Sequence, residues 1–173
     1  MSAIFRITLS LNSQDRLREV GPVIPASWAA TPNNWQTQVR GNVLLDTGAS
    51  HLCIDAAVAR ELGIAEAGKE DVDGLGGKRS LSTCDATLLL EVVPLVAMPN
   101  VKQGSQVSIG FPLRVQVVEG LKRSYQDRGI VTPNGLPVIG ILGRTILQFT
   151  TFTYEGLSGR IVIDIDETIR HPR

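Results

Sequence analysis

The amino-acid sequence predicts an all-β fold, because segments with the two-residue period of strands recur along the chain while helical patterns are few and short. Apolar side chains alternate with other side chains across residues 4–11 and 107–117, and a further β-like run follows a glycine-rich stretch at 81–93. Two more β-like segments, 149–154 and 160–165, flank a turn-rich linker and predict a closing hairpin.

The length and composition are typical of one domain over residues 1–173, because 43% of the 173 residues are hydrophobic and only 5% are aromatic. Seventeen basic residues balance seventeen acidic ones, so long-range attraction favours neither nucleic acid nor an anionic membrane as a partner. The first residues lack a basic segment followed by a long apolar core, and no later stretch is apolar for long enough to predict a membrane helix. We therefore expect a soluble, non-secreted, cytoplasmic protein.

Cysteine and histidine are too scarce to suggest a metal site. Cys53 and Cys84 have neither metal-ligand nor CxxC spacing, which favours buried reduced thiols over a disulfide. His51 and His171 are the only histidines, so we expect neither a metal cluster nor a His-based nucleophilic triad. No cofactor is predicted.

The N-terminal part of the chain begins with a half-buried strand at 4–11. Residues 12–38 contain three prolines and several asparagines, which predicts mainly a long irregular loop. Loops of this length are often binding elements or insertions. Trp28 and Trp35 are expected to anchor parts of it to the body of the domain, a simpler role than stacking on a ligand.

An apolar run, Val43-Leu44-Leu45, then brings Asp46 directly before a turn at Gly48. The common alternative for an Asp in this context is to cap a turn or a helix. Asp55 is better suited to that capping role, because it precedes a short helical pattern over 56–62 that Gly63 ends.

The central region contains a glycine-rich hairpin around Leu75, and the P-loop spacing that would make it a phosphate site is absent. A loop is expected at 94–104, and the strand at 107–117 is expected to be interrupted or bent at 110–112. Residues 119–137 are expected to form a polar connection. We therefore expect inserted loops near 12–38 and 94–135.

Near the C-terminus an apolar strand over 138–142 stops at Gly143 and turns into a short helix. The polar tail from residue 166 is expected to fray.

Three of these stretches together resemble the retropepsin-like aspartic proteases. Asp46-Thr47-Gly48-Ala49-Ser50 behind an apolar run resembles the catalytic loop, the glycines around Leu75 resemble the flap that closes over substrate, and Ile141-Leu142-Gly143-Arg144 resembles the second family signature. Their order is more specific than any one of them. The resemblance covers mainly 43–55, 72–92 and 138–165, and it implies a closed acid-protease barrel with one or two short helices.

The resemblance implies an aspartic endopeptidase. Hydrolysis without a metal or a covalent intermediate needs two carboxyl groups, one as general base and one as general acid, yet no second Asp-Thr/Ser-Gly is present. A two-fold homodimer would supply Asp46 twice, and an extended peptide would pair as an added strand beneath the flaps.

The site roles follow from the same resemblance. The resemblance gives catalytic roles to Asp46, Thr47 and Gly48. It implies that substrate is contacted by Ala49, Ser50, Gly74, Leu75, Gly76 and Gly77. It also implies that the site is supported structurally by Ile141, Leu142, Gly143 and Arg144. Thr47 would bond across the dimer interface, and the backbone around Gly48 would hold the two carboxylates coplanar.

One departure from the family pattern concerns Arg144. Viral members commonly have two acids where this chain has Ser50 and His51, and one of those acids pairs with the arginine. The departure suggests a cellular or bacterial branch and leaves the partner of Arg144 open.

Two other functions remain as alternatives. The same fold could serve as a peptide-binding or dimerisation module with little catalysis, because fold alone does not determine activity. A hydrolase that uses Cys53 or Ser50 as its nucleophile is disfavoured, because the sequence suggests no suitable base.

Overall fold

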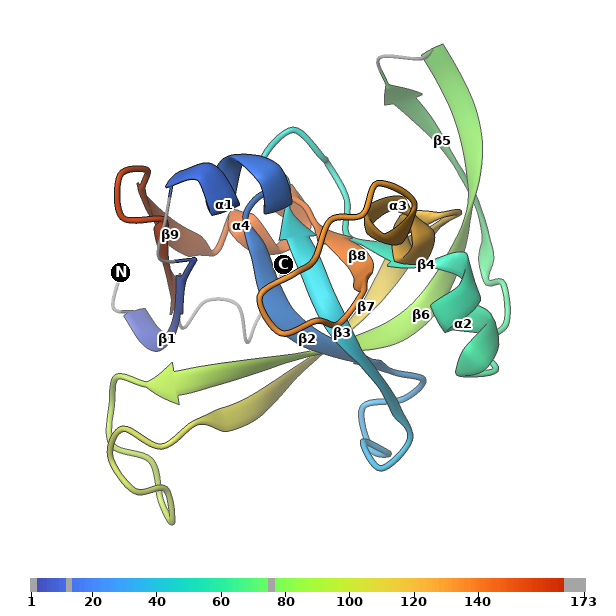
Figure 1. Cartoon of the computed structure of the whole chain (residues 1–173). Helices are drawn as coiled ribbons and strands as arrows, with labels where there is room; N and C mark the ends of the chain where they lie inside the picture. The colour runs from blue at the N-terminus through green and yellow to red at the C-terminus, as the bar shows by residue number, and fades with distance from the viewer. Residues whose placement is uncertain (1–2, 12–13, 75–76, 167–173) are drawn as a thin grey trace.

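The computed structural model describes residues 3–11, 14–74 and 77–166 (Figure 1). The predicted all-β class is confirmed, because strands dominate these residues and the helices are short. The strands are β1 (Ala3–Ser10), β2 (Val23–Ala29), β3 (Gln38–Leu45), β4 (Cys53–Asp55), β5 (Gly68–Gly74), β6 (Gly77–Pro94), β7 (Val107–Val118), β8 (Val138–Leu142), β9 (Thr150–Glu155) and β10 (Arg160–Asp166). The helices are α1 (Gln14–Val20), α2 (Ala56–Glu61), α3 (Leu121–Asp127) and α4 (Arg144–Leu147).

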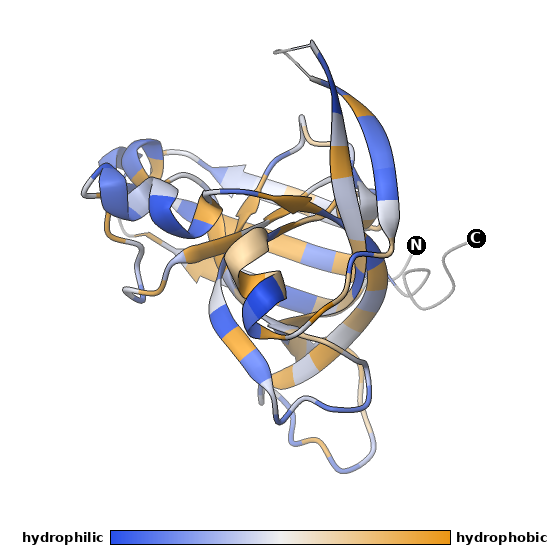
Figure 2. Ribbon diagram, turned by 90° about the vertical axis from the view of Figure 1, so that its right-hand side faces the viewer, coloured by the Kyte–Doolittle hydropathy of each residue, from blue (hydrophilic) through white to orange (hydrophobic). Residues whose placement is uncertain are grey.

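Six strands of the described chain close into a barrel. They follow the order β2–β3–β8–β4–β7–β6, and β6 pairs back with β2 through Ala26–Ala29. The β3–β8 and β4–β7 pairs are parallel, and the other neighbours in this ring are antiparallel. Trp28, Ile54 and Leu88 are fully buried on three of these strands. Closure removes free edges. Hydrophobic and hydrophilic residues alternate along the strands (Figure 2), and buried apolar side chains form the core.

A second group of strands extends from the barrel in the order β6–β1–β10–β9. The β9–β10 hairpin confirms the predicted closing hairpin, and β1 confirms the predicted first strand. Because β10 lies between β1 and β9, the strand β9 forms the outer edge of this sheet among the described residues. The tail predicted to fray lies from residue 167 onward outside the described residues.

The prediction of one long irregular loop over 12–38 is wrong, because this segment contains helix α1 and the barrel strand β2. β2 pairs on both sides, with β3 and with β6, and such tertiary pairing overrides the local effect of proline. Pro25 lies just outside the stretch that pairs with β6, so its missing N–H costs no bond to that strand. Trp28 is a core residue of β2, whereas Trp35 is 37% exposed.

The interruption that the sequence allows at 110–112 is not found. β7 runs without interruption, and its antiparallel register with β6 continues through the pair Thr87–Pro112. β4 pairs only with residues 116–118 of β7, so no second strand requires the N–H that Pro112 lacks. Helix α3 lies within the 119–137 segment, which had been predicted as a polar connection.

The predicted helix after the Asp46 loop is confirmed as α2, with Asp55 as its N-cap. Asp55 is 1% exposed, and its two carboxylate oxygens accept from two different helices. Oδ1 accepts from the backbone N–H of Ala57 in α2, and Oδ2 accepts from that of Lys122 in α3, both at 2.8 Å. One buried carboxylate therefore holds both helices at the same end of the barrel. None of the helices in the described part of the chain is long and apolar enough to span a bilayer.

We predict that Asp55→Ala lowers the free energy of unfolding by roughly 2–4 kcal/mol, because it removes one N-cap and leaves the N–H of Lys122 without its acceptor. Urea denaturation measures the loss. Asp127→Ala removes an exposed carboxylate from α3 and serves as the control. Equal stability of the two variants would contradict the bridging role.

Candidate active site

Asp46 lies at the end of β3, where the strand leaves the barrel. β3 is paired on both sides, with β2 and β8, so the position of its last residue is well determined. Leu45 is buried at 6% exposure, and the backbone N–H of Asp46 donates to the carbonyl of Leu142 in β8 at 3.1 Å. The carboxylate emerges from a rigid sheet into a half-buried position. The apolar strand therefore delivers the acid to a loop, as the sequence predicts.

The turn after Asp46 orients its carboxylate. Oδ1 accepts from the backbone N–H of Gly48 at 2.8 Å and from that of Ala49 at 3.3 Å. A Cβ at Gly48 would lie 3.1 Å from this same oxygen, so glycine permits the close approach. One carboxylate oxygen is thus fixed by main-chain donors.

The junction of β8 and α4 supports this loop from behind. The backbone N–H of Arg144 donates to the carbonyl of Ala49 at 2.9 Å, and its guanidinium Nη2 donates to Ser50 Oγ at 2.7 Å. A Cβ at Gly143 would collide with the carbonyl oxygens of His51 and Ala49. In this chain Ser50 is thus a hydrogen-bond partner of Arg144, at one of the two positions where viral members have acids.

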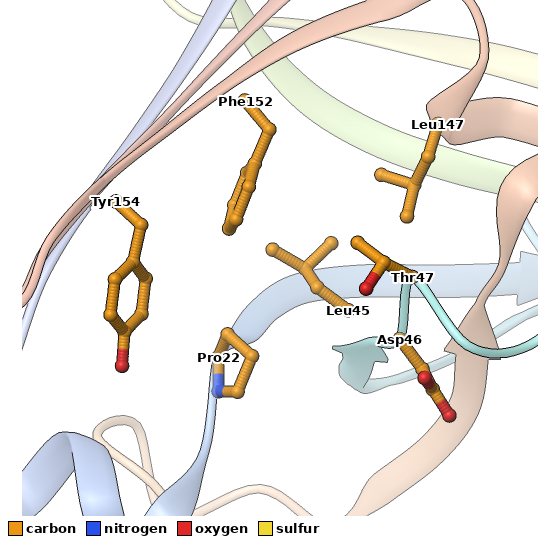
Figure 3. Close-up of a pocket in the computed structure, with 7 residues that line it drawn as sticks. All are labelled: Pro22, Leu45, Asp46, Thr47, Leu147, Phe152 and Tyr154. Atoms are coloured by element: carbon orange, nitrogen blue, oxygen red, sulfur yellow. The ribbon is translucent and has the colours of Figure 1, made fainter.

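A cavity of about 410 Å³ lies beside the loop, on the side of Thr47. In Figure 3 the Asp46 carboxylate points away from the aromatic residues that line the cavity. Phe152 and Tyr154, with ring centroids 6.2 Å apart, contribute one wall from β9. The complete lining consists of Pro22, Leu45, Asp46, Thr47, Leu147, Phe152 and Tyr154.

The glycine-rich hairpin forms the β5–β6 ribbon, which projects from the barrel at the upper right of Figure 1. Gly74 and Gly77 pair at its end, and Gly77 has a φ of 89°, a conformation suited to glycine. Leu75 and Gly76 lie outside the described residues. No hydrogen bond in the described part of the chain joins Gly74 or Gly77 to the Asp46 loop.

The structure therefore brings together two of the three predicted stretches directly. Ile141 and Leu142 pair in register with Leu44 and Leu45 of β3, next to the Asp46 loop. The third stretch, the ribbon, meets the loop region near its base, away from the tip.

Comparison with known proteins shows the family to which this chain belongs. A model of the family described as "Aspartyl protease" matches residues 31–146, which is most of the chain and includes the Asp46 loop and the ribbon. The chain belongs to the aspartyl protease family. Among solved structures, it is similar to a retropepsin-like aspartic protease from Rickettsia conorii, with 16% sequence identity over 95% of each chain and a TM-score of 0.44. A comparison with curated proteins finds no match.

The thiol nearest to the aspartyl protease loop is Cys53. It is buried at 6% exposure, as is Cys84 at 1%, and both cysteines are free, as predicted. Burial raises the pKa of the Cys53 thiol to about 11, and the negative charge of Asp46 adds to the shift. The neutral thiol is a poor nucleophile, so its environment argues against the Cys53 alternative. The described residues contain no group of three or more His, Cys, Asp or Glu side chains that could hold a metal ion.

Sequence reasoning missed the wall of the cavity that β9 provides. Phe152 and Tyr154 alternate with threonines, which predicts a strand and gives no sign of what the strand faces. Their position beside Asp46 depends on the β9–β10 pairing and on α4. The sequence also gave no prediction for Glu70 and Gln116, which contact one another near the base of the ribbon.

We predict that native Cys53 resists alkylation by iodoacetamide at pH 8. A pKa of about 11 instead of 9.0 lowers the thiolate fraction roughly 100-fold at this pH, and burial blocks access as well. Mass spectrometry of the peptide that contains Cys53 measures the labelling rate. The urea-unfolded protein is the control and should label at the rate of an ordinary thiol, whereas rapid labelling of the native protein would contradict the prediction.

Proposed function

We propose that the protein is an aspartic endopeptidase that acts as a homodimer, with Asp46 of each copy supplying one of two catalytic carboxyl groups. The observation that carries this proposal is the fixed orientation of Asp46, one of whose oxygens is held by the N–H groups of Gly48 and Ala49. Membership in the aspartyl protease family supports the reaction type. The proposed cleft-facing residues Ala49 and Ser50 continue from this loop.

The proposed chemistry requires two carboxyl groups that share one proton. Like charges a few ångströms apart cannot both ionise easily, so the pair titrates as a unit, as it does in other aspartic proteases. The ionised carboxylate removes a proton from water, and the protonated one donates its proton to the carbonyl oxygen of the peptide. The water oxygen bonds to the carbonyl carbon and gives a tetrahedral gem-diol. Its C–N bond breaks as the carboxyl group that took the proton from water passes that proton to the nitrogen, and a hydroxyl proton of the gem-diol returns to the other carboxylate.

The chain supplies only one Asp-Thr-Gly, so the second carboxyl group has to come from another molecule. Thr47 is exposed and adjoins the cavity, where it can contact a second copy. The ribbon around Gly74, Leu75, Gly76 and Gly77 is the proposed flap. An extended peptide would lie between the flap and the Asp46 loop and would add its backbone hydrogen bonds as a strand.

The cavity and the adjoining edge of β9 form the proposed dimer surface. Tyr154 is 49% exposed beside Asp46 and Thr47, where an apolar partner would cover it. β9 consists mostly of threonine and aromatic residues, and it has neither the lysine nor the proline that commonly protects an edge strand. Its one carboxylate, Glu155, is already paired with Arg160 at 3.4 Å. Two copies could therefore pair along β9 without bringing unpaired charges together.

Asp46→Asn tests the catalytic proposal. We expect cleavage of a mixed peptide library to fall by roughly 10²–10⁴-fold, because the general acid–base pair is lost. Asp71→Asn, which changes an exposed carboxylate on β5, is the control and should retain activity. Undiminished proteolysis by Asp46→Asn would exclude the proposed role. A wild-type protein that binds the peptides but cleaves none would support the peptide-binding alternative.

Tyr154→Asp tests the dimer surface. We expect the dimer dissociation constant to rise by about tenfold or more, because two like charges would meet in an apolar interface. Analytical ultracentrifugation gives this constant, and the specific activity should fall at low protein concentration and recover at high concentration. Leu157→Asp places the same charge at a side chain that is 89% exposed in the β9–β10 turn. If the two variants dimerise equally well, or if the wild-type enzyme is active as a monomer, the proposed dimer surface is wrong.

A further inference from the structure

Glu70 connects the proposed flap to two other parts of the molecule. It lies on β5, and its Oε2 accepts a hydrogen bond from Gln116 Nε2 of β7 at 3.0 Å. Its Oε1 lies 3.5 Å from His51 Nε2, in the segment that follows the Asp46 loop. The two oxygens of one carboxylate thus contact the barrel wall and the catalytic loop region.

The contact with Gln116 is the stronger of the two. Gln116 is 4% exposed, so its amide depends on protein partners, and a hydrogen bond to a charged acceptor is stronger than one between neutral groups. On its other side Gln116 Oε1 lies 3.9 Å from Cys53 Sγ, which in turn lies 3.8 Å from the carbonyl oxygen of His51. Glu70, Gln116, Cys53 and His51 therefore form a closed ring of contacts, which we call the flap-base ring.

The contact with His51 has a defined orientation. His51 Nδ1 is buried and has no hydrogen-bond partner among the residues that the structure describes, whereas Nε2 faces Glu70. The imidazole therefore presents Nε2, and not Nδ1, to the carboxylate of Glu70. The neighbouring Ser50 is held by Arg144, so His51 belongs to a restrained segment. Glu70 consequently contacts a part of the loop region that has little freedom to move.

The ribbon needs such an attachment. Among the described strands β5 pairs with β6 alone, and a two-stranded ribbon is marginally stable without packing against other elements. Within the described residues, Glu70 is the member of β5 for which side-chain hydrogen bonds or ion pairs to other elements are found. The next residue, Asp71, points to the opposite face of the strand and is exposed.

We propose that Glu70 is a positioning residue for the proposed hydrolysis, and that its carboxylate holds the base of the flap in register with the catalytic loop through Gln116 and His51. This inference rests on the proposed function for its catalytic part. A flap held at its base has less conformational freedom to lose when substrate is bound. The flap-base ring therefore favours substrate binding, whereas the chemical step depends on Asp46.

Glu70→Ala tests the positioning role, with Asp71→Ala as a control that removes the same charge from the adjacent residue. We expect hydrogen exchange of the amides at residues 68–74 to become about three- to tenfold faster in Glu70→Ala, since one charge-assisted hydrogen bond and one exposed polar contact with His51 are lost. The amides of the β1–β10 pair serve as an internal reference and should not change. We expect KM to rise by a similar factor while kcat changes little, which is the pattern for lost uniform binding.

Two further variants separate positioning from general destabilisation. Glu70→Gln keeps an oxygen that can accept a hydrogen bond from Gln116. This variant should therefore keep most of the exchange protection of the wild-type protein, and its KM should lie close to the wild-type value. His51→Gln combined with Glu70→Ala should add little to the effect of Glu70→Ala alone, because both changes break the same contact.

The outcomes distinguish this inference from the proposed function. Faster exchange confined to residues 68–74 in Glu70→Ala, with no proteolysis by any form of the protein, would retain the flap-base ring and reject the protease assignment. Exchange that is unchanged, that accelerates equally in Asp71→Ala, or that accelerates equally in the β1–β10 reference would overturn the positioning role. A fall in kcat at constant KM would also overturn it.

Discussion

The main-chain contact between the Asp46 loop and the β8–α4 junction is the constraint on which the site depends. The backbone N–H of Arg144 donates to the carbonyl of Ala49, and Gly143 leaves no room for a side chain against that loop. Both strands that end here, β3 and β8, are parallel neighbours inside a closed barrel, so the loop and the junction leave the sheet side by side. The orientation of the carboxylate is therefore a consequence of the barrel, with the turn residues completing it.

Because the barrel is closed, the edge strand β9 and the projecting β5–β6 ribbon both lie outside it. Barrel strands have no free edges, but β9 lies at the end of the β1–β10–β9 group, and β5 pairs only with β6 among the described strands. The first feature adjoins the cavity beside Asp46, and the second reaches the loop region through Glu70. In the proposed homodimer, association would involve the cavity beside Asp46, and the position of the flap would depend on the contact of Glu70 with His51.

Prediction from the sequence succeeded where a local pattern has a single physical solution. Asp55 before a short helical pattern capped that helix, and the alternating residues of β1, β7 and the β9–β10 hairpin formed strands. It failed at β2, where prolines suggested a loop but pairing with β3 and β6 makes a barrel strand. The strand is also not interrupted at Pro112, which is tolerated because β7 has no second partner at that position among the described strands. In both cases the neighbours of the strand, which local sequence does not contain, determined the result.

The sequence by itself determined the position of Asp46 after an apolar strand and the glycine turn that follows it, and it led to the prediction that a second chain supplies another carboxyl group. These follow from residue types within a few positions of one another and from a count of matching motifs. Only the tertiary structure decided that Ser50 binds Arg144, that Phe152 and Tyr154 stand beside the loop, and that Glu70 meets Gln116 and His51. Such partners are far apart in the sequence, with a separation of 46 positions for Glu70 and Gln116 and of 94 for Ser50 and Arg144, and strand pairing in the folded chain brings them together.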